Sequence, residues 1–245
     1  MRGYYTGRLA GERLRRAYEI APARVKQYLE AEIVHVLDRV PRGGVVLELG
    51  CGYGRVAFRL DASSPRVVGV DTSFDSISLA RALASKNESG SDCSPGIRPG
   101  WNPSPRGCRF VVMDAIALGF PDACFDAVVC VQNGICAFAV NPVEVLREAL
   151  RVTRPGGRAL FSSYADAFWP HRLDWFERQA AEGLVGSIDY ALSRDGAIVC
   201  HDGFRAGTMR PDDFVRLCAA IDVDACITKV DGSSVFCEIQ RGSGS

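Results

Sequence analysis

The chain has 245 residues, of which 47% are apolar, so it is long enough to bury one sizeable hydrophobic core. Its 29 basic residues balance its 29 acidic residues, which argues against a broad basic surface for nucleic acid. No 18 consecutive residues are apolar, and the first residues lack the apolar core of a signal peptide. We therefore expect a soluble, cytoplasmic protein that spans no membrane and binds no nucleic acid.

The first 40 residues predict a helical segment. Within residues 8–38, Ile33, Val36 and Leu37 fall on one face at helical spacing, which indicates one or two helices with a buried side. Tyr4 and Tyr5 come before them. We interpret residues 1–40 as a helical lid over a ligand site, with the two tyrosines at its tip.

Residues 45–60, VVLELGCGYGRVAFRL, are the most informative segment, because an apolar strand runs into a glycine turn that opens a helix. Gly50, Gly52 and Gly54 remove three side chains, so the backbone can turn sharply and a ligand can contact the main chain. Glu48 ends the strand, at the edge where open α/β sheets bind ligands. Its carboxylate can bind an ammonium or hydroxyl group, and Cys51 lies between the first two glycines.

The glycine spacing bears on which nucleotide cofactor would bind. In the dinucleotide pattern G-x-G-x-x-G/A, the third small residue lets the helix pack closely on the strand. That position is Arg55, which fits poorly, whereas G-x-G-x-G preceded by an acid fits another pattern. A second strand, residues 66–71, ends at Asp71, where a carboxylate can accept both ribose hydroxyls. Either cofactor needs such an acid, so Asp71 supports nucleotide binding without separating the two classes.

Two further strands are predicted to end in polar residues. A β-rich run within residues 109–120 ends at Asp114. A strand at 125–131 is followed by Gln132 and Asn133, which we expect at its carboxyl end as cofactor or substrate contacts. Beyond them lie a helix, a turn at 154–157 (RPGG) that we interpret as a structural hinge, and a strand at 158–163.

In this order, residues 40–165 resemble the Rossmann-like (class I) S-adenosylmethionine-dependent methyltransferases, in particular the small-molecule group that includes ubiquinone and menaquinone methyltransferases. The resemblance implies an α/β fold with a seven-stranded, mostly parallel sheet, helices on both faces and an antiparallel last strand. It also implies S-adenosylmethionine as cofactor and S-adenosylhomocysteine as product. In such enzymes Asp71 would bind the ribose and Thr72 would lie against the adenine. Asp114 would accept a hydrogen bond from the adenine amino group, the amide of Ala115 would meet a ring nitrogen, and Tyr5 would contact the cofactor from the lid.

We interpret residues 1–245 as one domain: the lid at 1–40, a cofactor-binding core at 41–164, an inserted cap at 165–208, and a last helix with a terminal hairpin at 209–245. The cap is expected to shape the substrate pocket, as a helix followed by a hairpin that turns at Asp195-Gly196. Within it, His201 beside Asp202 is the preferred candidate for a catalytic base. Residues 87–107 are rich in Ser, Gly and Pro and predict a surface loop, in which Trp101 could fold back over an adenine edge.

The sequence contains ten cysteines but no C-x-x-C pair and no Cys/His zinc spacing, so we expect no metal site. Cys130, Cys226 and others lie in apolar patterns, where thiols act as small core residues. One sharper alternative is that Cys136 and Cys200 bind a thiophilic substrate, as in arsenic methyltransferases.

The leading functional hypothesis is a methyltransferase that transfers the cofactor's methyl group to a small-molecule acceptor by in-line displacement. A methyltransferase for nucleic acid or protein is disfavoured by the neutral charge and by QNGI, which stands where an N-P-P-Y-like motif would follow the fourth strand. A catalytically silent protein that binds adenosylmethionine in the same pocket remains an alternative.

Overall fold

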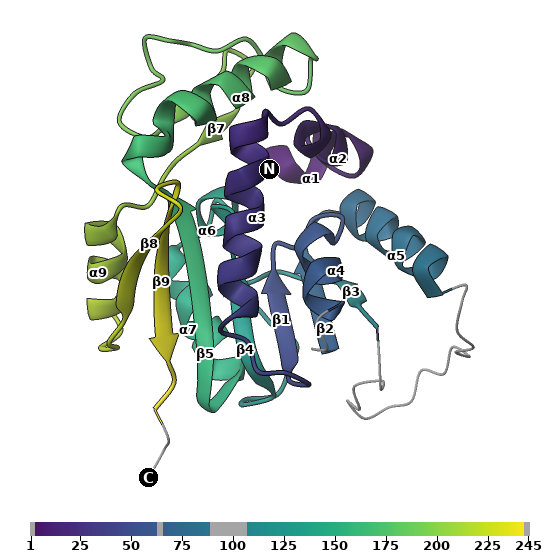
Figure 1. The fold of residues 1–245 in the computed structure, drawn as a ribbon, viewed down its shortest axis with the longest axis vertical. Coiled ribbons are helices and arrows are strands. Elements are labelled where there is room, and N and C mark those ends of the chain that lie inside the picture. The colour runs from purple at the N-terminus through teal and green to yellow at the C-terminus, as the bar shows by residue number, and fades with distance from the viewer. Residues whose placement is uncertain (1–2, 63–65, 89–106, 243–245) are drawn as a thin grey trace.

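The computed structural model describes residues 3–62, 66–88 and 107–242. Its centre is a seven-stranded sheet in the order β3-β2-β1-β4-β5-β9-β8 (Figure 1). The strands are β1 (Val45–Leu49), β2 (Arg66–Asp71), β3 (Arg109–Val112), β4 (Phe125–Cys130), β5 (Thr153–Tyr164), β8 (Cys226–Val230) and β9 (Ser234–Gln240). In this sheet order, the first five strands (β3, β2, β1, β4 and β5) are parallel to one another. Strand β9 is antiparallel to both of its neighbours, β5 and β8. The predicted Rossmann-like fold with an antiparallel pair at its end is confirmed.

Helices cover both faces of the sheet (Figure 1). Val45 and Leu47 of β1 pack in one apolar cluster with α7 (Pro142–Val152) and α9 (Pro211–Ala219). Val46 points the other way and packs in a second cluster with helices of the opposite face, which are α3 (Ala23–Leu37), α4 (Arg55–Asp61) and α5 (Phe74–Glu88). Every residue of β1 is buried, as expected of a central parallel strand covered on both sides.

The N-terminal segment forms α1 (Tyr4–Gly7) and α2 (Glu12–Glu19) before α3. Ile33 and Val36 of α3 are fully buried against the sheet, and Leu37 packs beside them, as predicted. In Figure 1, α1 and α2 lie at the end of the sheet toward which the arrow of β1 points. The lid helices and the carboxyl ends of the central parallel strands therefore meet at the same edge.

Above this edge lies the cap, which contains η1 (Asp166–Phe168), α8 (Trp169–Ala181), β6 (Ile198–Val199) and β7 (Arg205–Ala206) (Figure 1). The predicted hairpin exists as β6 and β7, but these two strands do not turn at Asp195-Gly196. Since Val199 pairs with Arg205, the chain reverses at residues 200–204 instead. Asp195-Gly196, with both φ angles positive, turns within the preceding reversal of the chain, which an antiparallel bridge between Ile188 and Cys200 closes. Earlier in this segment the Asp189 carboxylate accepts hydrogen bonds from the Ala191 and Leu192 amides and winds the chain into a separate turn.

The hinge predicted at 154–157 also differs. It lies inside β5, which begins at Thr153 directly after α7 instead of at residue 158. Thr153 pairs with Phe125 and Arg158 with Ala127, so the intervening residues bulge out of the ladder. Gly156 has a φ of 77°, and its amide bonds the carbonyl of Arg241 at 2.8 Å, which fastens the bulge to the end of β9.

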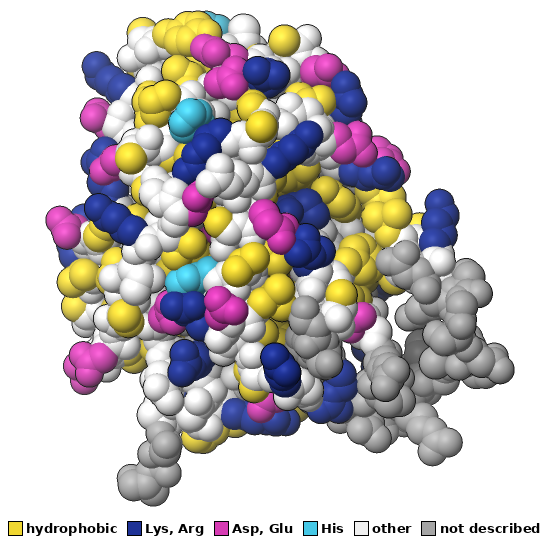
Figure 2. Space-filling model, viewed as in Figure 1, with side chains coloured by type: hydrophobic (Ala, Val, Ile, Leu, Met, Phe, Trp, Pro, Cys, Tyr) yellow, Lys and Arg dark blue, Asp and Glu magenta, His cyan; other side chains and the backbone are white. Residues whose placement is uncertain are grey.

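Several other sequence expectations have structural outcomes. Most of the predicted loop at 87–107, including Trp101, lies outside the described residues. Among the residues that are described, no helix has the length and apolarity needed to cross a membrane. Cys130, Cys218 and Cys237 are buried, but Cys226 is exposed because it begins the edge strand β8, so its predicted core position is wrong. On the face drawn in Figure 2, basic and acidic side chains are interspersed.

Candidate functional site

A cavity of about 590 Å³ opens where the carboxyl ends of the parallel strands meet the lid and the cap. Of the residues predicted to bind the cofactor, all except one line it: Tyr5, Glu48, Gly50, Cys51, Gly52, Asp71, Thr72, Asp114, Ala115, Gln132 and Asn133. The exception is Gly54, where an added β-carbon would lie 2.6 Å from the ring of Phe110. Gly54 therefore lets α4 pack on the sheet and does not face the cavity.

The glycine turn is shaped by its backbone conformation. Gly50 and Gly52 have φ angles of 71° and 54°, in the left-handed region that favours glycine. An added β-carbon would lie 2.6 Å from Phe138 at Gly50 and 2.9 Å from Leu14 at Gly52. Any larger residue here would strain the turn and displace the side chains that pack against it. The two glycines therefore leave the backbone of the turn accessible from the cavity.

Asp71, at the tip of β2, is held in one orientation. Its Oδ2 accepts a hydrogen bond from the Gly52 amide at 2.9 Å, and its Oδ1 accepts one from the Ser73 amide at 2.8 Å. Burial raises the pKa of Asp71 above its ordinary value, although these amide hydrogen bonds oppose the shift. The carboxylate is thus fixed beside the glycine turn, with Thr72 next to it in the cavity wall.

The neighbouring strand ends add a row of polar groups. Asp114 follows β3, and its Oδ1 accepts a hydrogen bond from the Ile116 amide at 3.2 Å. Glu48 lies in β1 and Gln132 follows β4. Because the strands are ordered β3-β2-β1-β4, the cavity meets Asp114, Asp71, Glu48 and Gln132 in that order along its length.

Several polar atoms in this row lack partners. Glu48 is only 4% exposed, and its Oε2 has no hydrogen-bond partner in the described structure. The same holds for Nε and Nη2 of Arg55 and for Nε2 of Gln132. Burial raises the pKa of Glu48 to about 8, although the positive charge of Arg55 opposes the shift. Buried polar groups in native proteins are normally paired, so these atoms identify the part of the cavity built for a polar ligand.

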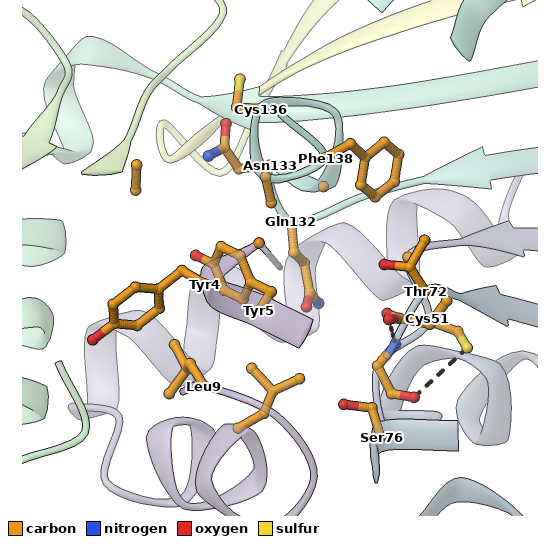
Figure 3. A pocket seen from close by; sticks show the side chains of 18 of the residues that line it. Tyr4, Tyr5, Leu9, Cys51, Thr72, Ser76, Gln132, Asn133, Cys136 and Phe138 are labelled. Carbon is orange, nitrogen blue, oxygen red and sulfur yellow. Dashed lines mark hydrogen bonds between the residues drawn. The ribbon is translucent and has the colours of Figure 1, made fainter. Parts of the chain in front are cut away.

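Gln132 and Asn133 form the fourth strand tip, and both adopt left-handed φ angles, of 57° and 64°. The side chain of Gln132 lies between Tyr4, Tyr5 and Leu9 on one side and Cys51, Thr72 and Ser76 on the other (Figure 3). Asn133 is used differently. Its Oδ1 accepts from the Ser163 hydroxyl at 2.7 Å, and its Nδ2 donates to the Gly207 carbonyl at 3.0 Å. Asn133 therefore ties the strand tip to the end of the cap.

The side of the cavity beneath the cap is mostly aromatic and apolar, although Arg205 of β7 also lines it. Burial raises the pKa of Tyr4 to about 12 and the pKa of Cys136 to about 11, and it raises that of Tyr5 still further. Trp175 and Phe176 of α8 complete this wall. These residues exclude water from the site and carry no ionised group at neutral pH.

The two candidates in the cap hairpin lie elsewhere. His201 is in the turn between β6 and β7, its side chain is 63% exposed, and it is not among the cavity-lining residues. Its neighbour Asp202 accepts hydrogen bonds from Tyr4 and Arg8 of the lid instead of orienting the imidazole. The predicted base His201 therefore does not face the cavity. Cys136 lines the cavity, but Cys200 packs in the apolar core of the cap, so the structure does not form the paired thiol site.

Sequence reasoning missed three residues at this site. Arg55 is a poor match to the dinucleotide pattern, although its position directly after the glycine turn already places it beside a ligand. Tyr18 lines the cavity from α2, and the helical pattern alone carried no signal for that. Glu32 lies behind the cavity and accepts a hydrogen bond from the Gln132 amide at 2.7 Å. An acid inside the apolar face of a predicted helix was the available signal for Glu32.

Comparisons with known proteins find similar methyltransferases. Residues 47–161 match a protein family described as a methyltransferase domain. The chain is 28% identical over 56% of its length to 2-methyl-6-phytyl-1,4-hydroquinone methyltransferase from Synechocystis. It is 33% identical to arsenite methyltransferase from Aquipseudomonas alcaligenes over 60% of its length, and 33% identical to demethylmenaquinone methyltransferase from Thermus thermophilus over 50%. These matches cover 39%, 40% and 47% of the three relatives, so the chain spans about half the length of the curated relatives it matches.

Solved structures share the fold. A methyltransferase from Methanosarcina mazei, described as dependent on S-adenosylmethionine, superposes with a TM-score of 0.59 at 17% identity. That alignment covers 85% of this chain and 97% of the other. A protein from Pyrococcus horikoshii superposes with a TM-score of 0.62 at 23% identity, over 90% of this chain and 92% of the other. At these identities the likeness concerns the fold, which extends well beyond the 47–161 segment.

Proposed function

Since the chain belongs to the class I S-adenosylmethionine-dependent methyltransferases, we propose that it transfers the methyl group of this cofactor to a small apolar acceptor bound beneath the cap. The family and the fold imply S-adenosylmethionine as the cofactor. The order of polar groups along the cavity carries the proposal, because it follows the order of the parts of that cofactor.

In this arrangement the tips of β3, β2 and β1 divide the binding of the cofactor among them. Asp114 and the Ala115 amide would bind the adenine, and the fixed Asp71 carboxylate would accept the ribose hydroxyls. Glu48, whose Oε2 is buried and unpaired, would accept a hydrogen bond from the ammonium of the methionine part. A buried acceptor without a partner fits a cationic donor, since leaving it unpaired is costly.

S-adenosylmethionine supplies a methyl group that is already activated by its positive sulfur, so the protein's task is mainly positional. The chain holds the acceptor in line and keeps water out, which is the role of the aromatic wall beneath the cap. Glu48 and Asp71 would stay at the amino-acid and ribose ends. A carboxylate closer to the sulfur would stabilise the charged reactant more than the transition state.

The chemistry of the cap side limits the acceptor. Among the described residues of this wall, the groups that could accept a proton are Tyr4, Tyr5, Tyr164 and Cys136, and burial holds the pKa of each above its ordinary value. None of them is a base at neutral pH. We therefore propose an acceptor whose attacking atom is nucleophilic without help from a protein base. The acceptor would be a small, apolar molecule that packs against the aromatic side chains beneath the cap. The chain has no net charge, and basic and acidic side chains are interspersed on the face drawn in Figure 2, which fits a small molecule better than a nucleic acid.

The test is calorimetric titration of the protein with S-adenosylmethionine and S-adenosylhomocysteine, followed by an acceptor screen that detects adenosylhomocysteine. We expect Asp71→Ala to abolish binding. Asp126→Ala is a matched control, because Asp126 also accepts a hydrogen bond from a backbone amide, that of Val45 at 2.7 Å, but at the opposite end of the strands. Binding without turnover of any acceptor would favour a silent binding protein, and no binding by the wild type would overturn the proposal.

A further inference from the structure

Arg55 is the first residue of α4 and lines the cavity directly after the glycine turn. Its Cζ lies 4.8 Å from the centre of the Tyr18 ring, so α2 of the lid supplies one face of the guanidinium's surroundings. Nε and Nη2 of Arg55 are buried and have no hydrogen-bond partner among the described residues. The described structure also contains no ion pair to this arginine, whereas Arg59, one turn further along α4, pairs with Glu30 at 2.6 Å.

A guanidinium carries only donors, arranged as a fork that matches a carboxylate. When such donors are buried without acceptors they cost free energy, and native proteins rarely leave them so. A ring stacked against the guanidinium satisfies its face but not its N–H groups. The free Nε and Nη2 therefore need an acceptor that the described residues do not provide, and the cavity is where that acceptor can come from.

The unpaired Oε2 of Glu48 lines the same cavity from the end of β1, just before the glycine turn that Arg55 follows. The unpaired carboxyl oxygen of Glu48 and the unpaired guanidinium nitrogens of Arg55 thus lie on either side of the glycine turn. This is complementary to the two charged groups of an amino acid, with the ammonium at Glu48 and the carboxylate at Arg55.

We propose that Arg55 binds the carboxylate of the cofactor's methionine part and so makes the site selective for a cofactor with an intact amino acid. Tyr18 keeps the guanidinium oriented and thereby couples the position of α2 to that contact. The inference deepens the proposed function and rests on it, because it assigns a role to Arg55 within the same cavity.

The test compares two ligands in titration calorimetry: S-adenosylhomocysteine and its decarboxylated analogue, which keeps the amine but lacks the carboxylate. The wild type should bind the intact compound about 10- to 100-fold more tightly, as expected for hydrogen bonds to a charged group. Arg55→Met should lose that preference by weakening the intact compound alone. Arg55→Lys, which keeps the charge but not the fork, should fold normally and show an intermediate preference. Arg59→Met removes the same charge from the exposed face of α4 and should leave both affinities unchanged.

Equal weakening of both ligands in Arg55→Met would overturn the assignment and leave Arg55 with only its contact to Tyr18. A wild type that binds both compounds equally well would overturn it too, without affecting the proposed function. If the wild type binds neither compound, the proposed function itself fails and the assignment fails with it. Circular dichroism of each variant separates a lost ligand contact from a lost fold, and Arg55→Lys keeps the test decisive if Arg55→Met does not fold.

Discussion

Glu32 of α3 accepts a hydrogen bond from the backbone amide of Gln132 at 2.7 Å, across 100 residues of sequence. Glu32 is fully buried, and the same amide also donates to the Ser162 hydroxyl at 2.8 Å. The contact holds Gln132 in a left-handed conformation that residues other than glycine rarely adopt. An acid on the N-terminal helix therefore fixes the strand tip that borders the cavity.

This buried acid predicts a pH-dependent stability. Burial raises the pKa of Glu32 from its ordinary 4.5 to about 7. Because the pKa of Glu32 is higher in the folded state, its protonation stabilises the folded protein fully below pH 4.5. This contribution to the free energy of unfolding, roughly 3 kcal/mol, is lost as pH rises toward 7. Glu32→Gln should remove that dependence, so the variant gains stability relative to the wild type between about pH 4.5 and 7.

Urea unfolding at several pH values measures this difference. Glu30→Gln is the matched control, since Glu30 lies on the same helix but is exposed and paired with Arg59, which lowers its pKa. A difference between wild type and Glu32→Gln that stays constant across this range would contradict the account. Such a constant difference in the free energy of unfolding would reflect only the hydrogen bonds changed by the substitution.

Binding of the cofactor should release a proton from Glu48. Its pKa of about 8 means that the carboxyl is mostly protonated at pH 7 in the free protein. An ammonium placed beside it favours the ionised form, so affinity should rise with pH up to about 8. The binding enthalpies measured by calorimetry at pH 7 in phosphate and in Tris should therefore differ. The expected difference is the difference between the ionisation enthalpies of the two buffers, multiplied by the number of protons released, up to one. Glu48→Gln should bind more weakly and show less proton release; an unchanged release would place the proton elsewhere.

The lid should loosen when its contact with the cap is cut. The Tyr4 hydroxyl donates to Asp202 at 2.7 Å, and the ring of Tyr4 lines the cavity. Tyr4→Phe keeps the ring and removes the hydrogen bond, so global stability should change by no more than about 1 kcal/mol. Hydrogen exchange within α1 should nevertheless accelerate, and cofactor affinity should fall a few-fold.

Tyr190→Phe provides the comparison for the lid, because the Tyr190 hydroxyl donates to Glu177 at 2.9 Å on the exposed side of the cap. It should change neither α1 exchange nor affinity. Identical exchange in α1 for wild type and Tyr4→Phe would show that the lid is not held by this contact.

The cap should depend on one buried cation. Arg172 is fully buried and donates to the carbonyls of Gly196 at 2.7 Å and of Ala206 and Gly207 at 2.9 Å. Arg172→Met would leave these carbonyls unpaired, so we expect destabilisation of about 3 kcal/mol or more in urea unfolding. Arg178→Met, on the exposed side of the same helix, should cost under about 1 kcal/mol. Equal stability of the two variants would rule out the structural role of Arg172.

The sequence was sufficient for the parallel core, since the apolar strands and the glycine turn are local patterns with a fixed physical meaning. The polar strand tips from Glu48 to Gln132 followed from the rule that ligands bind at carboxyl ends. The cap hairpin was not predictable in register, because its strands have two residues each and Asp189 winds the chain before them. For the same reason, the sequence did not show that His201 lies in the exposed turn of this hairpin and not in the cavity. The contact of Glu32 with Gln132 depends on tertiary packing that no local pattern records.

The central claim is that the cofactor lies along the strand tips, with its adenine at Asp114 and its amino-acid end at Glu48. A crystal structure of the complex with S-adenosylhomocysteine tests it most directly. The account predicts ribose hydroxyls bonded to Asp71 and the ammonium bonded to Glu48. An empty cavity at saturating ligand, or a ligand bound in the reverse direction, would contradict it.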